Sequence, residues 1–370
     1  MRLRLSAAFF PVRPTGIIKV AERTHSLALM PQLDSIRAIS VFAVIYTHYI
    51  PIKYWAFNIY WGEFGVRCFF VLSGFLITTI LLRDRDKATS LRAAYMSFLV
   101  RRALRLYPAL IAVLLVCALL GVKPVRQTLL WNLAYLTNFY IAMIDALPGA
   151  TTHLWTLAVE EQFYLIWPVV IFFAPRRLLP FVLFCVVVSA LVFRLLWRSA
   201  GLGELGANGL PPGSFDALAM GALLALFKDR QKLIATAGLT SACFWLSMTL
   251  TGWPGDFWFF KETDFSGLAA NLVFVWIVAR AAVGIGGFIG AVLDNAALQY
   301  IGIISYGIYL IHNFTPAALD TVGLLQHGPW WHETLAAVGL TVALASLSWH
   351  LLERPIIHHG RRRLITAIAS

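Results

Sequence analysis

An arginine and a histidine, Arg37 and His48, lie eleven positions apart in an otherwise mostly apolar stretch. Eleven helical residues make three turns and about 20°, so both side chains fall on one face, about 16 Å apart along the axis. An ionisable residue inside a membrane helix is energetically costly and by default marks a functional site. An imidazole titrates near neutral pH, so His48 is a candidate site residue.

Both residues also have a structural interpretation. Arg37 could snorkel to the lipid headgroups beside Asp34, which is suited to start a helix. His48 could be a core histidine that bonds a backbone carbonyl. The first explanation leaves His48 unexplained, which favours chemistry at His48.

Two adjacent carboxylates, Glu160 and Glu161, stand in another apolar stretch. Glu160 and Tyr164 are four residues apart and share a helix face, whereas Glu161 points about 100° away. One carboxylate could pair structurally with an arginine while the other takes part in chemistry, and the residues alone leave that choice open. The other ionisable residues inside apolar stretches are Arg67, Arg194, Asp216 and His312.

The composition indicates what kind of element must position these groups. The chain has 370 residues, of which 59% are hydrophobic and 13% charged, whereas soluble domains are about 45 to 50% apolar. It therefore predicts an integral membrane protein. The net charge of +12 comes mainly from short loops between apolar runs, so no nucleic-acid partner is expected. The four cysteines form no CxxC pair or metal-ligand cluster, and no metal site is predicted.

The apolar runs predict an all-α, polytopic fold, because a bilayer-crossing helix needs about 17 to 25 apolar residues. Ten runs meet this requirement approximately. They are residues 35–52, 62–82, 104–121, 155–173, 178–198, 214–228, 233–250, 266–282, 300–317 and 333–352.

Positive charge decides how residues 127–144, which are long enough for an eleventh span, are interpreted. If they do not cross, one set of alternate loops holds 22 basic residues and the other set holds five. Such asymmetry is typical of a protein whose more basic loops face the cytoplasm. We therefore expect a re-entrant or surface-lying helix at 127–144 and both termini in the cytoplasm.

Several motifs follow one another in an order that resembles acyltransferase family 3, the integral membrane O-acetylases of O-antigen, exopolysaccharide, Nod factor and peptidoglycan. The resemblance covers about residues 33 to 355. The motifs are LDSIRAISVFAVIYTHY, GVRCFFVLSGFLIT, SFLVRRALRLYP, HLWTLAVEEQFYLIWP, FDALAMGALLAL, ISYGIYLIH and the final LERP.

The resemblance implies ten core helices that take an acyl group from a cytoplasmic donor, usually acetyl-CoA, and deliver it to a hydroxyl, often on a carbohydrate at the other face. It implies that His48 is catalytic, that Arg37 is the family's motif arginine, and that Glu160 rather than Glu161 is the functional acid. We expect His48 to take the hydroxyl proton and Glu160 to orient or charge its imidazole. A two-step route through an acyl-enzyme is the alternative. One continuous cavity should link Arg37 to His48.

The resemblance also sets expectations for organisation and location. Residues 33–355 would form the acyltransferase domain, with cytoplasmic tails at 1–32 and 356–370. The chain resembles the stand-alone members that carry no fused hydrolase-like domain. A bacterial inner membrane is the expected location, with the lipid bilayer, an acyl-CoA donor and a carbohydrate or glycolipid acceptor as partners. Acyl-CoA would be a co-substrate, and no permanently bound cofactor is expected.

Arg101, Arg102 and Arg105 are the expected donor-binding residues, because guanidinium groups bind phosphates through paired donors. A positive-inside anchor explains them equally well. The remaining binding candidates are Arg67, Ser73, Glu161, Tyr164, Asp216, Tyr309 and His312.

Each of these further candidates has an alternative. Ser73, beside Gly74, could serve close helix packing. Tyr309 and His312 could hydrogen-bond across helices instead of binding the acceptor. Asp216 could cap its helix or contact sugar hydroxyls. The aromatic segment 252–265 could be an interfacial belt or a stacking surface for a sugar.

Two other function classes compete with an acyltransferase. Polar groups at several depths could mark the path of a transporter or flippase, but the chain shows no internal repeat. A non-catalytic membrane scaffold would leave His48 and Glu160 without a role. The ordered motifs favour the enzyme.

Overall fold

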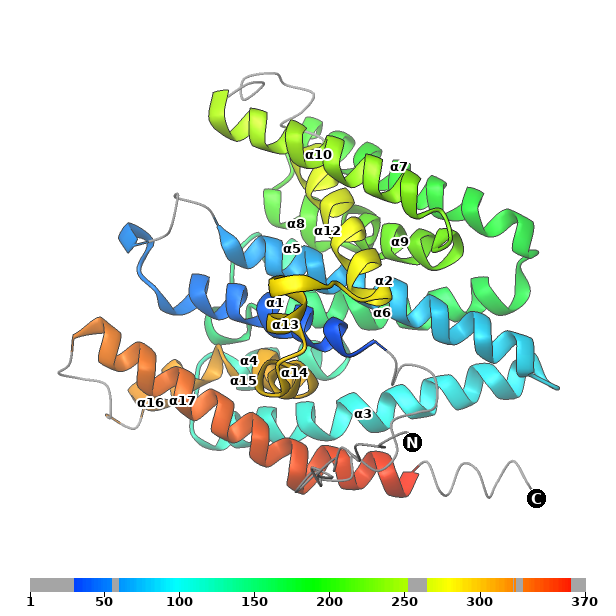
Figure 1. Cartoon of the computed structure of the whole chain (residues 1–370). Helices are drawn as coiled ribbons and strands as arrows, with labels where there is room; N and C mark the ends of the chain where they lie inside the picture. The colour runs from blue at the N-terminus through cyan, green and yellow to red at the C-terminus, as the bar shows by residue number, and fades with distance from the viewer. Residues whose placement is uncertain (1–29, 55–59, 252–264, 322, 324–328, 361–370) are drawn as a thin grey trace, which may run out of the picture.

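The structure is a computed structural model that describes residues 30–54, 60–251, 265–321, 323 and 329–360. The described chain is all-helical, as predicted (Figure 1). Most of the expected N-terminal tail, most of the aromatic segment 252–265 and most of the C-terminal tail lie outside the described residues. The helices are α1 (Pro31–Tyr49), α2 (Trp61–Lys87), α3 (Leu91–Leu119), α4 (Val125–Leu133), α5 (Thr137–Ile144), α6 (Leu154–Phe173), α7 (Leu179–Ser199), α8 (Glu204–Gly209), α9 (Pro211–Phe227), α10 (Gln231–Thr251), α12 (Phe265–Val283), α13 (Gly287–Leu293), α14 (Ala296–Ile303), α15 (Ser305–Ile311), α16 (Phe314–Thr321) and α17 (Trp330–Ser348).

Seven helical segments of the described chain are long and apolar enough to cross a membrane. The chain is therefore a multi-pass membrane protein. Helices α1 and α10 and the α14–α16 run, where three further spans are expected, fall outside this set. The seven segments are Trp61–Lys87, Leu91–Leu119, Gly149–Phe173, Arg176–Ser199, Glu204–Phe227, Phe265–Val283 and Trp330–Gly360.

Two segments show how local breaks shape the fold. Residues 127–144 fall in two short helices, α4 and α5, separated by a turn in which Tyr135 adopts a left-handed φ of 52°. Helices of nine and eight residues cannot cross a bilayer, which agrees with the prediction that this segment does not span. The single helix expected over 300–317 is wrong, because turns at Ile304 and at His312 and Asn313 divide it into α14, α15 and α16.

The packing of α2 against α9 forms the centre of the molecule. A Cβ on Gly74 of α2 would collide with the Leu218 carbonyl, and one on Gly221 of α9 would collide with the Val71 carbonyl. Two glycines therefore let these backbones approach closely, as small residues do between membrane helices. The close packing expected at Ser73 and Gly74 is confirmed for Gly74, while Ser73 faces the site described below.

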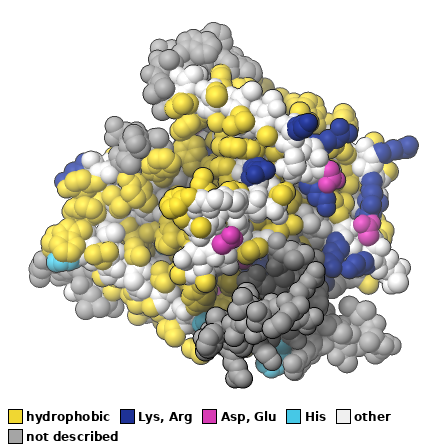
Figure 2. Space-filling model, viewed as in Figure 1, with side chains coloured by type: hydrophobic (Ala, Val, Ile, Leu, Met, Phe, Trp, Pro, Cys, Tyr) yellow, Lys and Arg dark blue, Asp and Glu magenta, His cyan; other side chains and the backbone are white. Residues whose placement is uncertain are grey.

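Side-chain types divide the surface in the way a membrane protein requires. Figure 2 shows hydrophobic side chains over most of the visible face, with Lys and Arg gathered towards the end where α2 meets α3. This end carries Arg83, Arg85, Lys87 and Arg92 from the loop richest in basic residues. In the predicted topology it is the cytoplasmic end.

Candidate active site

A cavity of about 80 Å³ opens between α1, α2, α3, α6, α15 and the turn that joins α4 to α5. Helical periodicity brings its polar side chains together. On α6, Thr156, Glu160 and Tyr164 recur every four residues, and on α3, Arg102 and Arg105 are three apart. The lining residues are Arg37, Val66, Phe69, Phe70, Ser73, Arg102, Arg105, Leu106, Tyr135, Thr156, Leu157, Glu160, Glu161, Tyr164, Ser305, Tyr306 and Tyr309.

Three guanidinium groups and two carboxylates share this small space. No ion pair within 4.0 Å joins Arg102 or Arg105 to Glu160 or Glu161 in the described part of the chain. The Arg102 guanidinium lies over the Tyr164 ring, 4.0 Å from its centroid, and its Nε has no hydrogen-bond partner. Among the three arginines, Arg37 lies 3.4 Å from Asp34, whereas Arg102 keeps an unpaired Nε donor in the described structure. An unpaired cationic donor in a membrane-embedded cavity is suited to an anionic ligand.

Glu160 and Glu161 both line the cavity, and neither forms an ion pair with an arginine within the described structure, so the alternative that one of them is a paired structural carboxylate finds no support here. Glu160 Oε1 accepts a hydrogen bond of 2.6 Å from Ser73 Oγ. This bond joins α6 to α2 and fixes the carboxylate at the cavity wall.

His48 lies outside this cavity, on the exposed side of α1. Its Nδ1 lies 2.9 Å from the Val44 carbonyl oxygen, the kind of backbone bond that the structural interpretation predicted. In the described structure Glu160 hydrogen-bonds Ser73 and His48 hydrogen-bonds Val44, so the role expected for Glu160 in orienting or charging the His48 ring stays a prediction. The cavity that Arg37 lines also does not include His48, so the continuous cavity expected between them is not present there.

A cluster of imidazole rings connects His48 to the cavity wall instead. The His312 ring centroid lies 5.0 Å from that of His48, 4.8 Å from that of His153 and 5.3 Å from that of Tyr309. Tyr309 lines the cavity, and its hydroxyl lies 2.6 Å from Thr156 Oγ1, another lining group. His48 therefore reaches the arginine-lined cavity through His312 and Tyr309.

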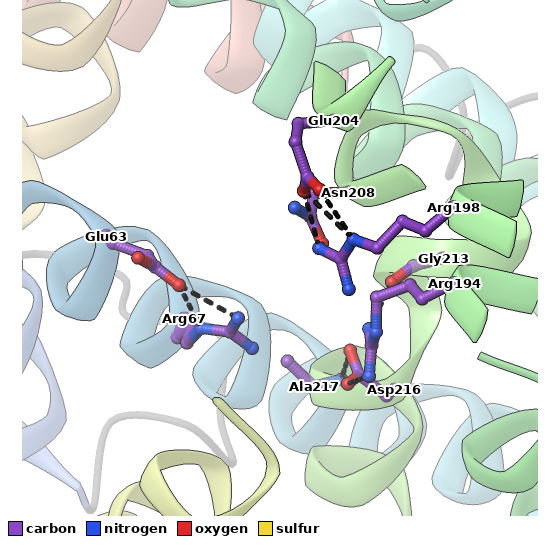
Figure 3. Close-up of polar contacts among 9 residues, drawn as sticks. All are labelled: Glu63, Arg67, Arg194, Arg198, Glu204, Asn208, Gly213, Asp216 and Ala217. Atoms are coloured by element: carbon purple, nitrogen blue, oxygen red, sulfur yellow. Dashed lines mark hydrogen bonds and ion pairs between the residues drawn. The ribbon is translucent and has the colours of Figure 1, made fainter. Parts of the chain in front are cut away.

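Three predicted site residues, Arg101, Arg67 and Asp216, do not line the cavity. Arg101 is exposed and pairs with Asp84 at 2.7 Å, because it points away from the face of α3 that carries Arg102 and Arg105. Arg67 lies 2.9 Å from Glu63, one turn earlier on α2 (Figure 3).

Asp216 also lies away from the cavity lining. It lies 3.0 Å from Arg194, and both side chains are nearly fully buried, so the pair joins α7 to α9 (Figure 3). The capping role expected for Asp216 is wrong, because α9 begins five residues earlier at Pro211.

Several lining or neighbouring residues were not identified from the sequence. Tyr135 is 6% exposed, and its hydroxyl has no partner of good hydrogen-bond geometry. Gln162 donates a 2.7 Å bond to the Tyr135 carbonyl and a 3.0 Å bond to Asn138, which holds this turn against α6. His153 precedes α6 and joins the imidazole cluster. Gln162, directly after the two carboxylates, and His153, the first residue of the motif HLWTLAVEEQFYLIWP, carried signals that could have identified them.

Comparison with known proteins supports the same family as the motifs. The family model described as an acyltransferase domain matches residues 30–350. The peptidoglycan O-acetyltransferase OatA of Listeria monocytogenes is 28% identical over 370 residues, which cover 91% of this chain and 57% of the relative. Nodulation protein 10 of Rhizobium leguminosarum bv. viciae is 29% identical over 327 residues, covering 81% of this chain and 84% of the relative. The chain thus spans little more than half the length of OatA.

No solved structure matches this chain. The family assignment rests on the sequence match over most of the chain, which agrees with the ordered motifs and the all-helical membrane fold. The chain belongs to the acyltransferase family whose domain model spans residues 30–350.

Proposed function

We propose that this chain is a membrane O-acyltransferase that moves an acyl group, in the first instance acetyl, from acyl-CoA to a hydroxyl of a carbohydrate-containing acceptor. The observation that carries the proposal is the arrangement of an arginine-lined cavity beside an imidazole cluster that ends at His48. A surface polysaccharide or lipopolysaccharide is the acceptor class we favour, and a bacterial cytoplasmic membrane is the location. The name of OatA, a peptidoglycan O-acetyltransferase, supports a glycan acceptor by analogy.

The donor is assigned to the cavity. Arg102 and Arg105 come from the basic, cytoplasmic half of α3, and Arg37 comes from the first turns of α1. Coenzyme A carries a pyrophosphate and a 3′-phosphate, which guanidinium groups bind through paired donors. We assign phosphate binding to Arg37, Arg102 and Arg105 because all three line the cavity, although Arg37 also lies 3.4 Å from Asp34. We leave out Arg101 because it lies outside the cavity lining and pairs with Asp84.

The acceptor is assigned to the exposed side of His48. Because a carbonyl oxygen only accepts, the bond from His48 Nδ1 to Val44 places the ring hydrogen on Nδ1 and leaves Nε2 as the basic nitrogen. Nε2 takes the proton of the acceptor hydroxyl as its oxygen attacks the thioester carbonyl. A carbon–oxygen bond forms, the carbon–sulfur bond breaks, and coenzyme A leaves as the thiol.

Release of free CoA thiol tests this function directly. Full-length protein in liposomes is supplied with acetyl-CoA and with glycan from the host envelope, and acetylated glycan is measured by mass spectrometry. We expect CoA release that depends on the glycan and falls by about 10² to 10⁴-fold in His48→Ala. His332→Ala removes an exposed histidine of α17 and serves as the matched control. Glycan transport without CoA release would support a transporter and reject the proposal.

A further inference from the structure

His312 is a buried polar residue to which the proposed function gives no task. Its side chain is 0% exposed, and its Nε2 has no hydrogen-bond partner in the described structure. Leaving a buried polar atom unpaired is costly, so such an atom calls for a reason. The ring stands between His48 and His153, with centroid separations of 5.0 and 4.8 Å.

The hydrogen bonds fix which nitrogen of each ring is basic. His312 Nδ1 lies 2.6 Å from the Tyr309 carbonyl oxygen, just as His48 Nδ1 lies 2.9 Å from that of Val44. Since both carbonyls can only accept, both rings carry their hydrogen on Nδ1. The Nε2 atoms of His48 and His312 are therefore both free to take up a proton.

The proposed reaction needs a route for one proton. The acceptor hydroxyl loses it to His48 as the carbon–sulfur bond breaks, and the thiolate must gain a proton as coenzyme A withdraws into the cavity, where His48 is not among the lining residues. Tyr309 is among them, and its ring packs 5.3 Å from that of His312. His312 Nε2 makes no direct hydrogen bond to either neighbour in the described structure, so one bridging water molecule would have to complete each contact.

We propose that His312 and Tyr309 form a relay that returns the acceptor proton from His48 to the thiolate of coenzyme A, an inference that rests on the function proposed above. His48 Nε2 receives the proton from the hydroxyl, His312 Nε2 receives it from His48, and the Tyr309 hydroxyl passes a proton to the sulfur while taking one from His312. The proton that leaves oxygen thus arrives on sulfur, and every residue of the relay ends in its starting state. His312 acts through its neighbours and is a positioning residue.

Chemical rescue separates this role from packing. In the liposome assay, His312→Ala should lower kcat by about 10² to 10³-fold, with the KM for acetyl-CoA changed less than twofold. Added imidazole should restore kcat at least tenfold, because it supplies both an N–H and a basic nitrogen. Pyrrole has the same shape and the N–H but no basic nitrogen, so it should restore nothing.

The outcomes distinguish the possible failures. Equal rescue by pyrrole, or a kcat that His312→Ala leaves unchanged, would overturn the relay. If the variant is not recovered folded in detergent, Tyr309→Phe removes a single hydroxyl and should lower kcat about tenfold at constant KM; an unchanged kcat there overturns the relay as well. Absence of glycan-dependent CoA release in the unaltered protein would instead reject the proposed function.

Discussion

Two groups of charged residues lie among the helices of this protein, and their surroundings differ. Arg194 and Asp216 are 1% and 2% exposed and lie 3.0 Å apart. Arg194 also donates a 2.5 Å bond to the Gly213 carbonyl, so this pair is satisfied within the protein. In the cavity, by contrast, Arg102, Arg105, Glu160 and Glu161 form no ion pair with one another within the described structure.

The difference suggests a criterion for charged residues in a membrane protein: whether the charge already has an ion-pair partner within the protein. A charge placed among membrane helices is costly unless it is paired, and a paired charge is satisfied before any ligand arrives. Arg194 and Asp216 therefore hold α7 to α9. No ion pair joins the cavity charges within the described structure, so their remaining hydrogen-bonding capacity is available to the donor phosphates that we propose bind there. The Arg194–Asp216 pair and the cavity charges both lie in apolar stretches of the sequence. They differ in their ion-pair partners.

Removing half of the structural pair should have the largest effect. Asp216→Ala leaves Arg194 buried without its partner, which typically destabilises a protein by about 3 to 5 kcal/mol. We expect little monodisperse protein in detergent size-exclusion chromatography and a lower melting temperature for what remains.

A double variant sharpens this prediction. Asp216→Leu combined with Arg194→Met removes both charges at similar volume and should recover most of the folded protein, because such replacements are often neutral. If Asp216→Ala behaved like the unaltered protein in chromatography while losing acetylation activity, Asp216 would belong with the functional group.

Changing the cavity arginines should affect binding and leave folding intact. Arg105→Ala removes a guanidinium assigned to the donor phosphates, and we expect the KM for acetyl-CoA to rise about tenfold or more. The elution profile and melting temperature should stay unchanged. Arg101→Ala is the matched control on the same helix, and its KM should stay within twofold because Arg101 pairs with Asp84. If the KM for acetyl-CoA rose as much in Arg101→Ala as in Arg105→Ala, the assignment of the donor phosphates to the cavity arginines would be contradicted.

Much of the fold could be predicted because it depends on local sequence. Apolar runs and positive charge indicate a helical membrane protein, and the structure confirms that residues 127–144 contain no spanning helix. The break of 300–317 at Ile304 could not be predicted, since no proline or glycine stands at that turn, whereas Pro316 in the first turn of α16 is a signal for the second break. Tertiary packing determines the turn at Ile304, and both turns carry His312 to the imidazole cluster.

The sequence predicted several of the residues that line the cavity, but it did not predict which of them contact one another. The motifs and the resemblance identified Arg102, Arg105 and Glu160 as site candidates, and all three line the cavity. They could not tell that His48 contacts His312 rather than Glu160, because that contact joins residues far apart in the chain. Arg101 shows the same limit, since its one-residue offset from Arg102 sends it to Asp84.

We expect the smallest effect on activity from removing the hydrogen bond that Ser73 of α2 donates to the cavity carboxylate Glu160. Ser73→Ala removes the 2.6 Å bond to Glu160 and leaves the charge in place. A hydrogen bond to a charged group contributes about 1.5 to 3 kcal/mol, but Arg102, Arg105 and cavity water can compensate part of this loss. We therefore expect kcat to fall about three- to tenfold, measured as glycan-dependent CoA release.

Thr79→Val is the control, because it removes a hydroxyl whose hydrogen bond goes to its own helix, and it should leave kcat unchanged. Equal effects of both variants would mean that the Ser73 hydroxyl matters for α2 itself and that its bond to Glu160 does not contribute to activity.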